Sequence, residues 1–322
     1  MRHLTSLFDV TSSEVREILN LAARLKAEAK RGKRRPLCAG RVLTQVFEKP
    51  SLRTRVSFEA GMNQLGGSSL FLTAKEAGFD GRETKEDIAR VLGGYSDIIV
   101  LRTFSQELIE TFTRYAEKPI INGLSDAFHP CQALADVMTV EEALGKVKGK
   151  HIVYIGDGNN VARSLANVCG HTGARFTIAA PKGYELDEPY LARAKETFPK
   201  LELTQTNDPY EAVKGAHVIY TDVWASMGQE SEKDSRTQAF ADLQVTEELL
   251  NAAGKNVRFM HCLPARRGLE VTAEVMLDPR SLVFPQAENR MHLAKGLIVW
   301  LLQQAKAKPK KAARKVTKKT KR

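Results

Sequence analysis

The sequence predicts an α/β protein made of two Rossmann-like domains, each a parallel β-sheet flanked by helices. Short apolar segments typical of buried strands alternate with segments of helical periodicity. A second series of this kind begins at HIVYIG, residues 151–156, directly after the polar segment LGKVKGK. The chain has 322 residues, which is enough for two ordinary α/β domains.

The first half opens with a helix whose start is marked by a capping box. Thr11 and Glu14 have the T-x-x-E spacing, and apolar residues from Val15 to Leu25 follow with helical period. Strands and helices then alternate, as expected for parallel βαβ units. The predicted strands are 42–47, 68–72, 97–101 and 119–121, and the predicted helices lie near 54–65, 84–93, 105–117 and 130–144.

The second half repeats this order without visible sequence repetition. Its predicted strands lie near 151–155, 175–179, 202–205, 217–221 and 257–261, with helices near 160–172, 188–197 and 209–214. We therefore expect one domain over 1–147 and another over 148–287. An apolar helix over 288–304 is expected to pack back on the first domain, and 305–322 to form a disordered basic tail.

The basic charge of the chain is concentrated in that tail. From Lys306 to Arg322 there are ten Lys or Arg and no acidic residue, and removing these ten from the net charge of +11 leaves about +1 for the rest. The tail has two interpretations: weak attraction to nucleic acid or another polyanion, and a solvated extension without a partner.

Cysteine spacing and hydropathy indicate a cytoplasmic protein without a metal or other cofactor. Cys38, Cys131, Cys169 and Cys262 are widely scattered, which favours reduced thiols over a disulfide framework, and no His/Cys cluster has metal-ligand spacing. No apolar run is long enough to span a bilayer, and the N-terminus lacks signal-peptide character.

Candidate site residues follow the predicted strands at their carboxyl ends, where open α/β sheets bind ligands. One such residue follows each of six strands, so all six are expected on one rim: Arg53, Arg102, His129, Asn160, Asp222 and Cys262.

The segment Ser51-Leu52-Arg53-Thr54-Arg55 lies where a strand gives way to a helix. Unpaired N–H groups at a helix start, two hydroxyls and the guanidinium of Arg53 would suit a phosphate, although the G-K-[ST] of a P-loop is missing. The alternative is a Ser51 N-cap with surface arginines. Arg55 lies one position past this cradle and is expected to form structural ion pairs.

The peptide His129-Pro130-Cys131-Gln132 opens another helix, with proline where a missing N–H costs nothing. His129 and Gln132 are then one turn apart and face the same way. The positive end of the helix disfavours a charged His129, so a neutral donor is expected. Simple capping is the alternative.

Five motifs in order give the sequence a resemblance to a known family. SLRTR, HPCQALAD, DVWASMGQE (222–230), HCLP (261–264) and QAENR (286–290) resemble those of the ornithine carbamoyltransferases, over nearly all of residues 1–304. The resemblance implies that the first domain binds carbamoyl phosphate, that the second binds ornithine, and that the products are citrulline and phosphate. This reaction belongs to arginine or urea-cycle-type metabolism, and the sequence does not distinguish biosynthetic from degradative use. It also implies a homotrimer whose active sites are shared between subunits.

The resemblance implies roles for individual residues. Ser51, Arg53, Thr54 and Arg102 would hold the phosphate, with the backbone N–H of Leu52. His129, Gln132, Cys262, Leu263 and Arg290 would surround the carbamoyl group, and Asn160, Asp222, Ser226 and Met227 would hold ornithine. In the family, the loop at 75–83 reaches a neighbouring subunit's site, and Arg82 is a weak candidate for its contacting residue.

The chemistry fits those roles. Carbamoyl phosphate carries a good leaving group, so the protein must orient the reactants and stabilise an oxyanion, for which Thr54, Arg102 and His129 are candidate donors. Asp222 and Cys262 would orient the neutral amine and relay its proton toward phosphate, while a covalent role for Cys262 is disfavoured. The stretch around SMG (226–228), polar from Gln229 to Thr237, is a candidate lid over ornithine.

Three alternatives stay open. Leu52 replaces the Thr more common in ornithine enzymes and is familiar from relatives that act on N-acylated ornithine. A nicotinamide dehydrogenase is suggested by HIVYIGDGNN, but Val161 replaces the third glycine and no acid ends the next strand. A polyanion-binding protein built around the tail would need a basic stripe on the body, which is nearly neutral.

Overall fold

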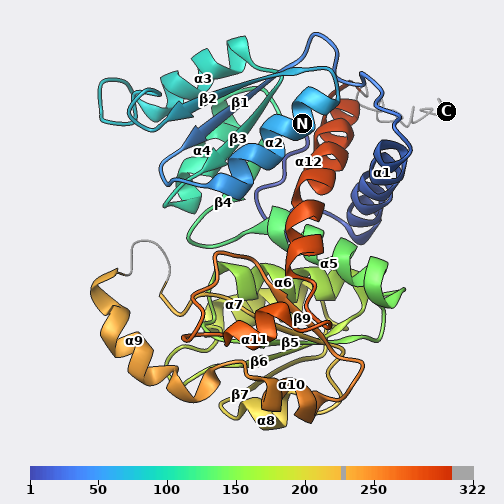
Figure 1. Cartoon of the computed structure of the whole chain (residues 1–322). Coiled ribbons are helices and arrows are strands. Elements are labelled where there is room, and N and C mark those ends of the chain that lie inside the picture. The colour runs from blue at the N-terminus through green and yellow to red at the C-terminus, as the bar shows by residue number, and fades with distance from the viewer. Residues whose placement is uncertain (226–229, 307–322) are drawn as a thin grey trace, which may run out of the picture.

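The computed structural model describes residues 1–225 and 230–306, which form two α/β units joined through two helices (Figure 1). The first sheet has the order β2-β1-β3-β4 and the second the order β7-β6-β5-β8-β9, with every neighbouring pair of strands parallel. The fold class predicted from the sequence is confirmed.

The first unit contains four of the strands and the helices between them. Its strands are β1 (Val42–Phe47), β2 (Ser68–Thr73), β3 (Ile98–Arg102) and β4 (Ile120–Leu124). Its helices are α1 (Ser12–Lys30), α2 (Leu52–Gln64), α3 (Lys85–Tyr95), α4 (Gln106–Tyr115) and α5 (Pro130–Leu144). The predicted capping box of α1 is present, since the Thr11 side chain accepts from the Glu14 N–H and the Glu14 carboxylate from the Thr11 N–H.

The second unit contains the remaining strands. They are β5 (His151–Ile155), β6 (Arg175–Ala179), β7 (Leu203–Thr206), β8 (Val218–Thr221) and β9 (Arg258–His261). The helices are α6 (Asn160–Thr172), α7 (Glu188–Thr197), α8 (Pro209–Ala212), α9 (Lys233–Ala239), α10 (Glu247–Ala253) and α11 (Ala273–Leu277), with 3₁₀ turns η1 (Glu230–Glu232) and η2 (Ala241–Leu243).

The long helix α12 (Val283–Lys306) leaves the second unit and packs beside α1, α2 and α5 of the first (Figure 1). Close approach needs a glycine at Gly296, because an added Cβ would lie only 2.7 Å from the Ala22 nitrogen of α1. One hydrophobic core runs through these helices and both sheets, and two smaller cores lie against one sheet each. The helix starts five residues before the predicted 288.

Three short helices were not predicted: α9, α10 and α11. Residues 230–237, which the sequence placed in a polar lid, are helical in η1 and α9. The rest of that lid, 226–229, and the tail from 307 onward lie outside the described residues. Among the described residues, no helix is both long enough and apolar enough to cross a membrane.

Candidate active site between the two sheets

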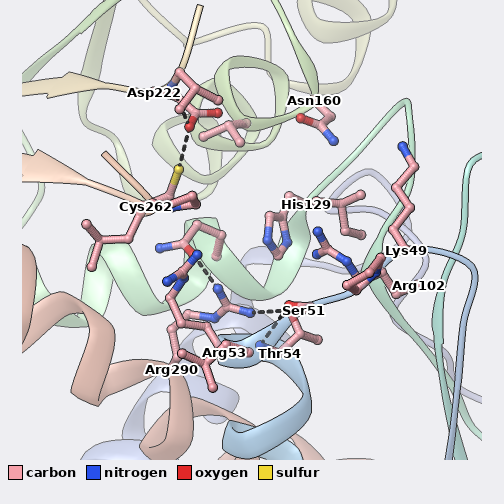
Figure 2. Close-up of a pocket in the computed structure, with 18 of the residues that line it drawn as sticks. Lys49, Ser51, Arg53, Thr54, Arg102, His129, Asn160, Asp222, Cys262 and Arg290 are labelled. Atoms are coloured by element: carbon pink, nitrogen blue, oxygen red, sulfur yellow. Dashed lines mark hydrogen bonds between the residues drawn. The ribbon is translucent and has the colours of Figure 1, made fainter. Parts of the chain in front are cut away.

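A cavity of about 380 Å³ lies where the carboxyl ends of both sheets face each other (Figure 2). Twelve of the fourteen residues predicted for the site line it: Ser51, Leu52, Arg53, Thr54, Arg102, His129, Gln132, Asn160, Asp222, Cys262, Leu263 and Arg290. The other two, Ser226 and Met227, lie outside the described residues. The strand-end rule thus placed all six of its residues on one rim.

The start of α2 forms one wall of the cavity. Ser51 is the N-cap, and its hydroxyl accepts a 3.2 Å hydrogen bond from the Thr54 N–H. The Thr54 hydroxyl in turn accepts from Arg290 Nη2 at 3.3 Å. The capping interpretation is therefore confirmed. It is compatible with the cradle interpretation, since Ser51, Arg53 and Thr54 all line the cavity.

Three guanidinium groups converge on this wall, from Arg53, Arg102 and Arg290 (Figure 2). Burial and the charges of Arg290 and Arg53 lower the pKa of Arg102 to about 10. Burial also lowers the pKa of Arg53, with Arg290 adding to the effect. Mutual repulsion of buried cations favours a bound anion at this wall.

His129 lies at the N-terminus of α5 beside these arginines. Burial lowers the pKa of its imidazole well below 6.5, and the charges of Arg290, Arg102 and Arg53 lower it further. The neutral state was predicted correctly, but from the helix dipole, whereas burial is the main cause. His129 Nδ1 is buried without a hydrogen-bond partner in the part of the chain that the structure describes.

The opposite wall carries an acid and a thiol at the ends of β8 and β9. Cys262 Sγ donates a 2.9 Å hydrogen bond to Asp222 Oδ1, which also accepts from the Val223 N–H at 2.8 Å. Burial and the Asp222 carboxylate raise the pKa of Cys262 well above its usual value. The thiol is therefore a neutral donor rather than a thiolate.

Two asparagines at the start of α6 border this wall. Asn160 Nδ2 donates to the Ser125 carbonyl at 2.5 Å and so joins the loops that follow β5 and β4. Asn159, which the sequence analysis missed, caps α6 and donates from Nδ2 to Asp222 Oδ2 at 3.4 Å. The GDGNN turn thus contacts the carboxylate of Asp222 through Asn159.

The turn after β9 rests on a buried histidine and a buried acid. The Leu263 N–H donates to His261 Nδ1 at 2.8 Å, and His261 Nε2 lies 3.2 Å from Glu270 Oε1, with both side chains fully buried. Glu270 Oε1 also accepts from the Arg266 N–H at 2.5 Å. These bonds hold Leu263 at a left-handed φ of 59° beside the cavity.

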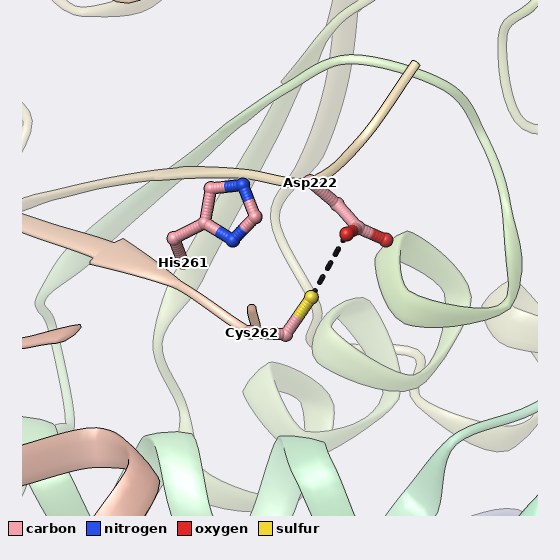
Figure 3. A group of neighbouring side chains, drawn as sticks. All are labelled: Asp222, His261 and Cys262. Carbon is pink, nitrogen blue, oxygen red and sulfur yellow. Dashed lines mark hydrogen bonds between the residues drawn. The ribbon is translucent and has the colours of Figure 1, made fainter. Parts of the chain in front are cut away.

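Asp222, His261 and Cys262 form a group with the composition of a metal site (Figure 3). Their ligand atoms lie within 4.8 Å of one another. Both ring nitrogens of His261 are engaged, one by Leu263 and one by Glu270, and the thiol donates to Asp222. A metal ion could bind here only after one of the His261 bonds was broken, so the donor set fits a metal poorly.

Both halves of the chain match models of one protein family. Residues 2–142 match the family described as aspartate/ornithine carbamoyltransferase, carbamoyl-P binding domain, and residues 148–301 match the Asp/Orn binding domain of that family. The chain belongs to the aspartate/ornithine carbamoyltransferase family. Ornithine carbamoyltransferase from Halalkalibacterium halodurans is 48% identical over 94% of this chain and 95% of its own length. The enzyme of Bacillus subtilis is also 48% identical, over 94% of each chain.

Solved carbamoyltransferase structures have the same fold. Ornithine carbamoyltransferase from Pyrococcus furiosus superimposes with a TM-score of 0.91 at 46% identity, covering 94% of this chain and 97% of that one. The Thermus thermophilus enzyme gives a TM-score of 0.84 at 40% identity, covering 93% and 98%. Membership of this family excludes the dehydrogenase alternative.

Two basic residues considered in the sequence lie away from the cavity of this carbamoyltransferase. Arg55 forms the predicted ion pair, with Glu59 at 3.0 Å, and it also lies over the Phe71 ring. Arg82 is exposed and lies 3.7 Å from Asp80. Lining residues that the sequence analysis did not select are Lys49, Pro50, Leu124, Val161, Val223, Ala225, Pro264 and Arg266. Lys49 lies two positions before Ser51, where the cradle begins, and its charge beside Pro50 was the available signal.

Proposed function

We propose that this chain transfers the carbamoyl group of carbamoyl phosphate to the δ-amine of L-ornithine, giving L-citrulline and phosphate. The observation that supports this most directly is the polarity of the cavity. Three arginines and a neutral histidine line one wall, while Asp222 and a protonated thiol line the other, so the cavity suits an anion on one side and an amine on the other.

In this mechanism the phosphate binds at the start of α2. Ser51, Arg53, Thr54 and Arg102 hold it, and the backbone N–H of Leu52 contributes without its side chain. Arginine suits this task because its planar fork matches phosphate oxygens. The unit with the first sheet is accordingly the carbamoyl-phosphate domain, and the unit with the second is the ornithine domain.

The carbonyl oxygen of the carbamoyl group gains negative charge when the amine attacks. Thr54, Arg102 and His129 stabilise that oxygen as donors, while Gln132, Cys262, Leu263 and Arg290 surround the group. Preorganised donors of this kind supply roughly 3–4 kcal/mol each in enzymes where one has been removed. The amine nitrogen bonds to the carbonyl carbon, the bond to the phosphate oxygen breaks, and phosphate leaves.

The attacking amine must lose a proton, because a free alkyl ammonium has a pKa of about 10. Asp222 accepts from that amine and orients it, and Asn160 lies at the same end of the cavity. Departing phosphate is the final proton acceptor. In this proposal Ser226 and Met227, which lie outside the described residues, complete the ornithine site.

The test is an assay for citrulline with carbamoyl phosphate and a panel of acceptors. L-ornithine should give the product, while putrescine and aspartate should not. N-acetylornithine tests the second candidate, an enzyme for N-acylated ornithine, which is favoured only by Leu52. No citrulline and no carbamoylated product from any acceptor would overturn the proposal.

The assembly and location of the protein are further parts of the proposal. A homotrimer that shares active sites, through the loop at 75–83, is implied by the family motifs, and sedimentation would test it. A cytoplasmic location in arginine biosynthesis stays a prediction. So does weak polyanion binding by the tail, which requires salt-sensitive binding that disappears when 307–322 are deleted.

A further inference from the structure

Behind the cavity, the carboxylate of Asp136 joins two glutamine side chains from different helices. Asp136 lies on α5, one turn after Gln132, and is 1% exposed. Its Oδ1 accepts from Gln132 Nε2 at 2.8 Å and from Gln286 Nε2 of α12 at 2.7 Å. Asp136 Oδ1 thus accepts hydrogen bonds from both glutamine amides.

This shared acceptor determines which way each amide faces. A glutamine amide has a donor end and an acceptor end, so turning both Nε2 groups toward Asp136 turns both Oε1 atoms away. Gln132 Oε1 accepts from Arg290 Nη1 at the cavity wall. Gln286 Oε1 accepts from the His261 N–H at 3.0 Å.

The two glutamines lead to opposite walls of the cavity. On one side, Arg290 bonds both Gln132 and the Thr54 hydroxyl, so Gln132 helps to orient donors on the phosphate wall. On the other side, His261 directly precedes Cys262, whose thiol donates to Asp222. Asp136 is the one described residue that bonds both glutamines directly.

We infer that Asp136 is a positioning residue that sets the two substrate walls relative to each other through Gln132 and Gln286. The inference rests on the proposed carbamoyl transfer. Misplacing a preorganised donor raises the barrier even when substrates still bind, because the donor must then be reoriented during the reaction.

The positioning role needs the acceptor oxygen rather than the negative charge. Burial raises the pKa of Asp136 to about 7, against the lowering effect of the hydrogen bonds from Gln132 and Gln286. Oδ1 can accept from both amides in the ionised form, and also in the protonated form with the proton on Oδ2. Asparagine reproduces this acceptor, whereas leucine has a similar size and no acceptor.

The experiment compares four purified full-length variants with the wild type by kcat, by KM for each substrate and by Tm. Asp136→Leu should lower kcat by about 30-fold or more, because both amides lose their orientation. Asp136→Asn should stay within about threefold of the wild type, because an amide oxygen replaces the carboxylate oxygen as acceptor. Gln286→Leu disconnects the β9 wall, so KM for ornithine should rise about tenfold. KM for carbamoyl phosphate should rise less, because Cys262 and Leu263 are only part of the set around the carbamoyl group, and the phosphate wall keeps its contacts.

Thr139→Val is the matched control. Thr139 is equally buried on α5 and accepts from Asn289 of α12 at 2.9 Å, but it lies away from the cavity. A lower Tm with unchanged kcat is expected for it. Equal loss of kcat in Thr139→Val and Asp136→Leu would leave only a packing role. Equal loss in Asp136→Asn and Asp136→Leu would show that the acceptor oxygen is not what matters, and either result would overturn the inference.

If Asp136→Leu does not fold, the Gln286→Leu variant decides. A selective rise in KM for ornithine supports the inference, and equal or absent changes for the two substrates overturn it. Failure of the proposed function looks different, since the wild type itself would then make no citrulline.

Discussion

Asp222 and Cys262 are brought together by the register of two parallel strands. Thr221 of β8 pairs with His261 of β9, so the next residue of each strand leaves the sheet at the same height. The Cys262 thiol therefore donates to Asp222 over 2.9 Å, and burial beside that carboxylate keeps the thiol protonated. This relationship assigns Cys262 the role of hydrogen-bond donor.

Substitutions at Cys262 test whether this residue acts as a hydrogen-bond donor or as a covalent nucleophile. Cys262→Ser retains a donor to Asp222, so kcat should fall by no more than about tenfold, whereas loss of a covalent nucleophile costs a factor of about 10⁴ or more. Cys262→Val removes the donor and should raise KM for ornithine further than Cys262→Ser does. An inactive Cys262→Ser enzyme, or a carbamoylated Cys262 found by mass spectrometry, would contradict this role.

The thiols of the native protein should react slowly at pH 8. Burial raises the pKa of Cys38 to about 11 and of Cys131 to about 12, and that of Cys262 also rises. At a pH below its pKa a thiol is mostly protonated, and three pH units below the pKa only about one part in a thousand is thiolate. Alkylation should therefore become faster only as the pH rises. Iodoacetamide labelling of native and urea-unfolded protein, read by mass spectrometry, checks this; rapid native labelling of Cys262 at pH 8 would refute it.

Arg102 should be essential for turnover while Arg55 should not. Arg102→Met removes a buried guanidinium from the cavity and should reduce kcat about 10²–10³-fold, the effect of losing one preorganised donor. Arg55→Met is the matched control, because Arg55 pairs with Glu59 outside the cavity. Steady-state kinetics of both variants give the comparison, and equal losses would show that general charge matters rather than placement.

Leu52 should have little influence on the choice of acceptor. Its side chain is 73% exposed at the first residue of α2, and only its backbone is assigned to phosphate binding. Leu52→Thr should change the ratio of kcat/KM for ornithine over N-acetylornithine by less than about threefold, well below the roughly 10–200-fold effect of a pocket-filling group. A reversal of preference would instead identify Leu52 as a specificity residue.

Arg236 should stabilise the segment after β8 that lines the Asp222 side of the cavity. Its guanidinium is buried, pairs with Asp157 and Glu232 at 2.8 Å each, and donates to the Trp224 carbonyl at 3.1 Å. Arg236→Gln leaves Asp157 without its ion pair and should cost about 3–5 kcal/mol of unfolding free energy in urea, as breaking a buried pair does. Arg236→Lys is the milder control and should recover part of that loss.

Most of the strands and much of the site could be predicted from local pattern. Buried parallel strands are short apolar runs, and they were placed within a few residues. β4 was predicted too short, as 119–121, because Asn122 and Gly123 do not resemble a buried strand. The short helices α9 to α11 were missed because five to seven residues give too little periodicity.

Neither the start of α12 nor the residues behind the cavity wall could be predicted from the local sequence pattern. Pro285 lies in the first turn of α12, where its missing N–H is harmless, so the helix begins before the predicted 288. Asp136 and Gln286 are 150 positions apart and meet only after both units have packed. Partners of this kind depend on tertiary structure, so a single sequence does not reveal them.

The position of Arg290 on α12 has a consequence for a chain emerging from a ribosome. A nascent chain that has exposed residues 1–225 already contains Arg53, Arg102 and His129, yet lacks the helix that packs on α1, α2 and α5. Domains generally fold in order of synthesis. Because α12 follows the last strand of the second unit, Arg290 can join the cavity wall only after that unit has been synthesised, so tight anion binding should arise late in translation.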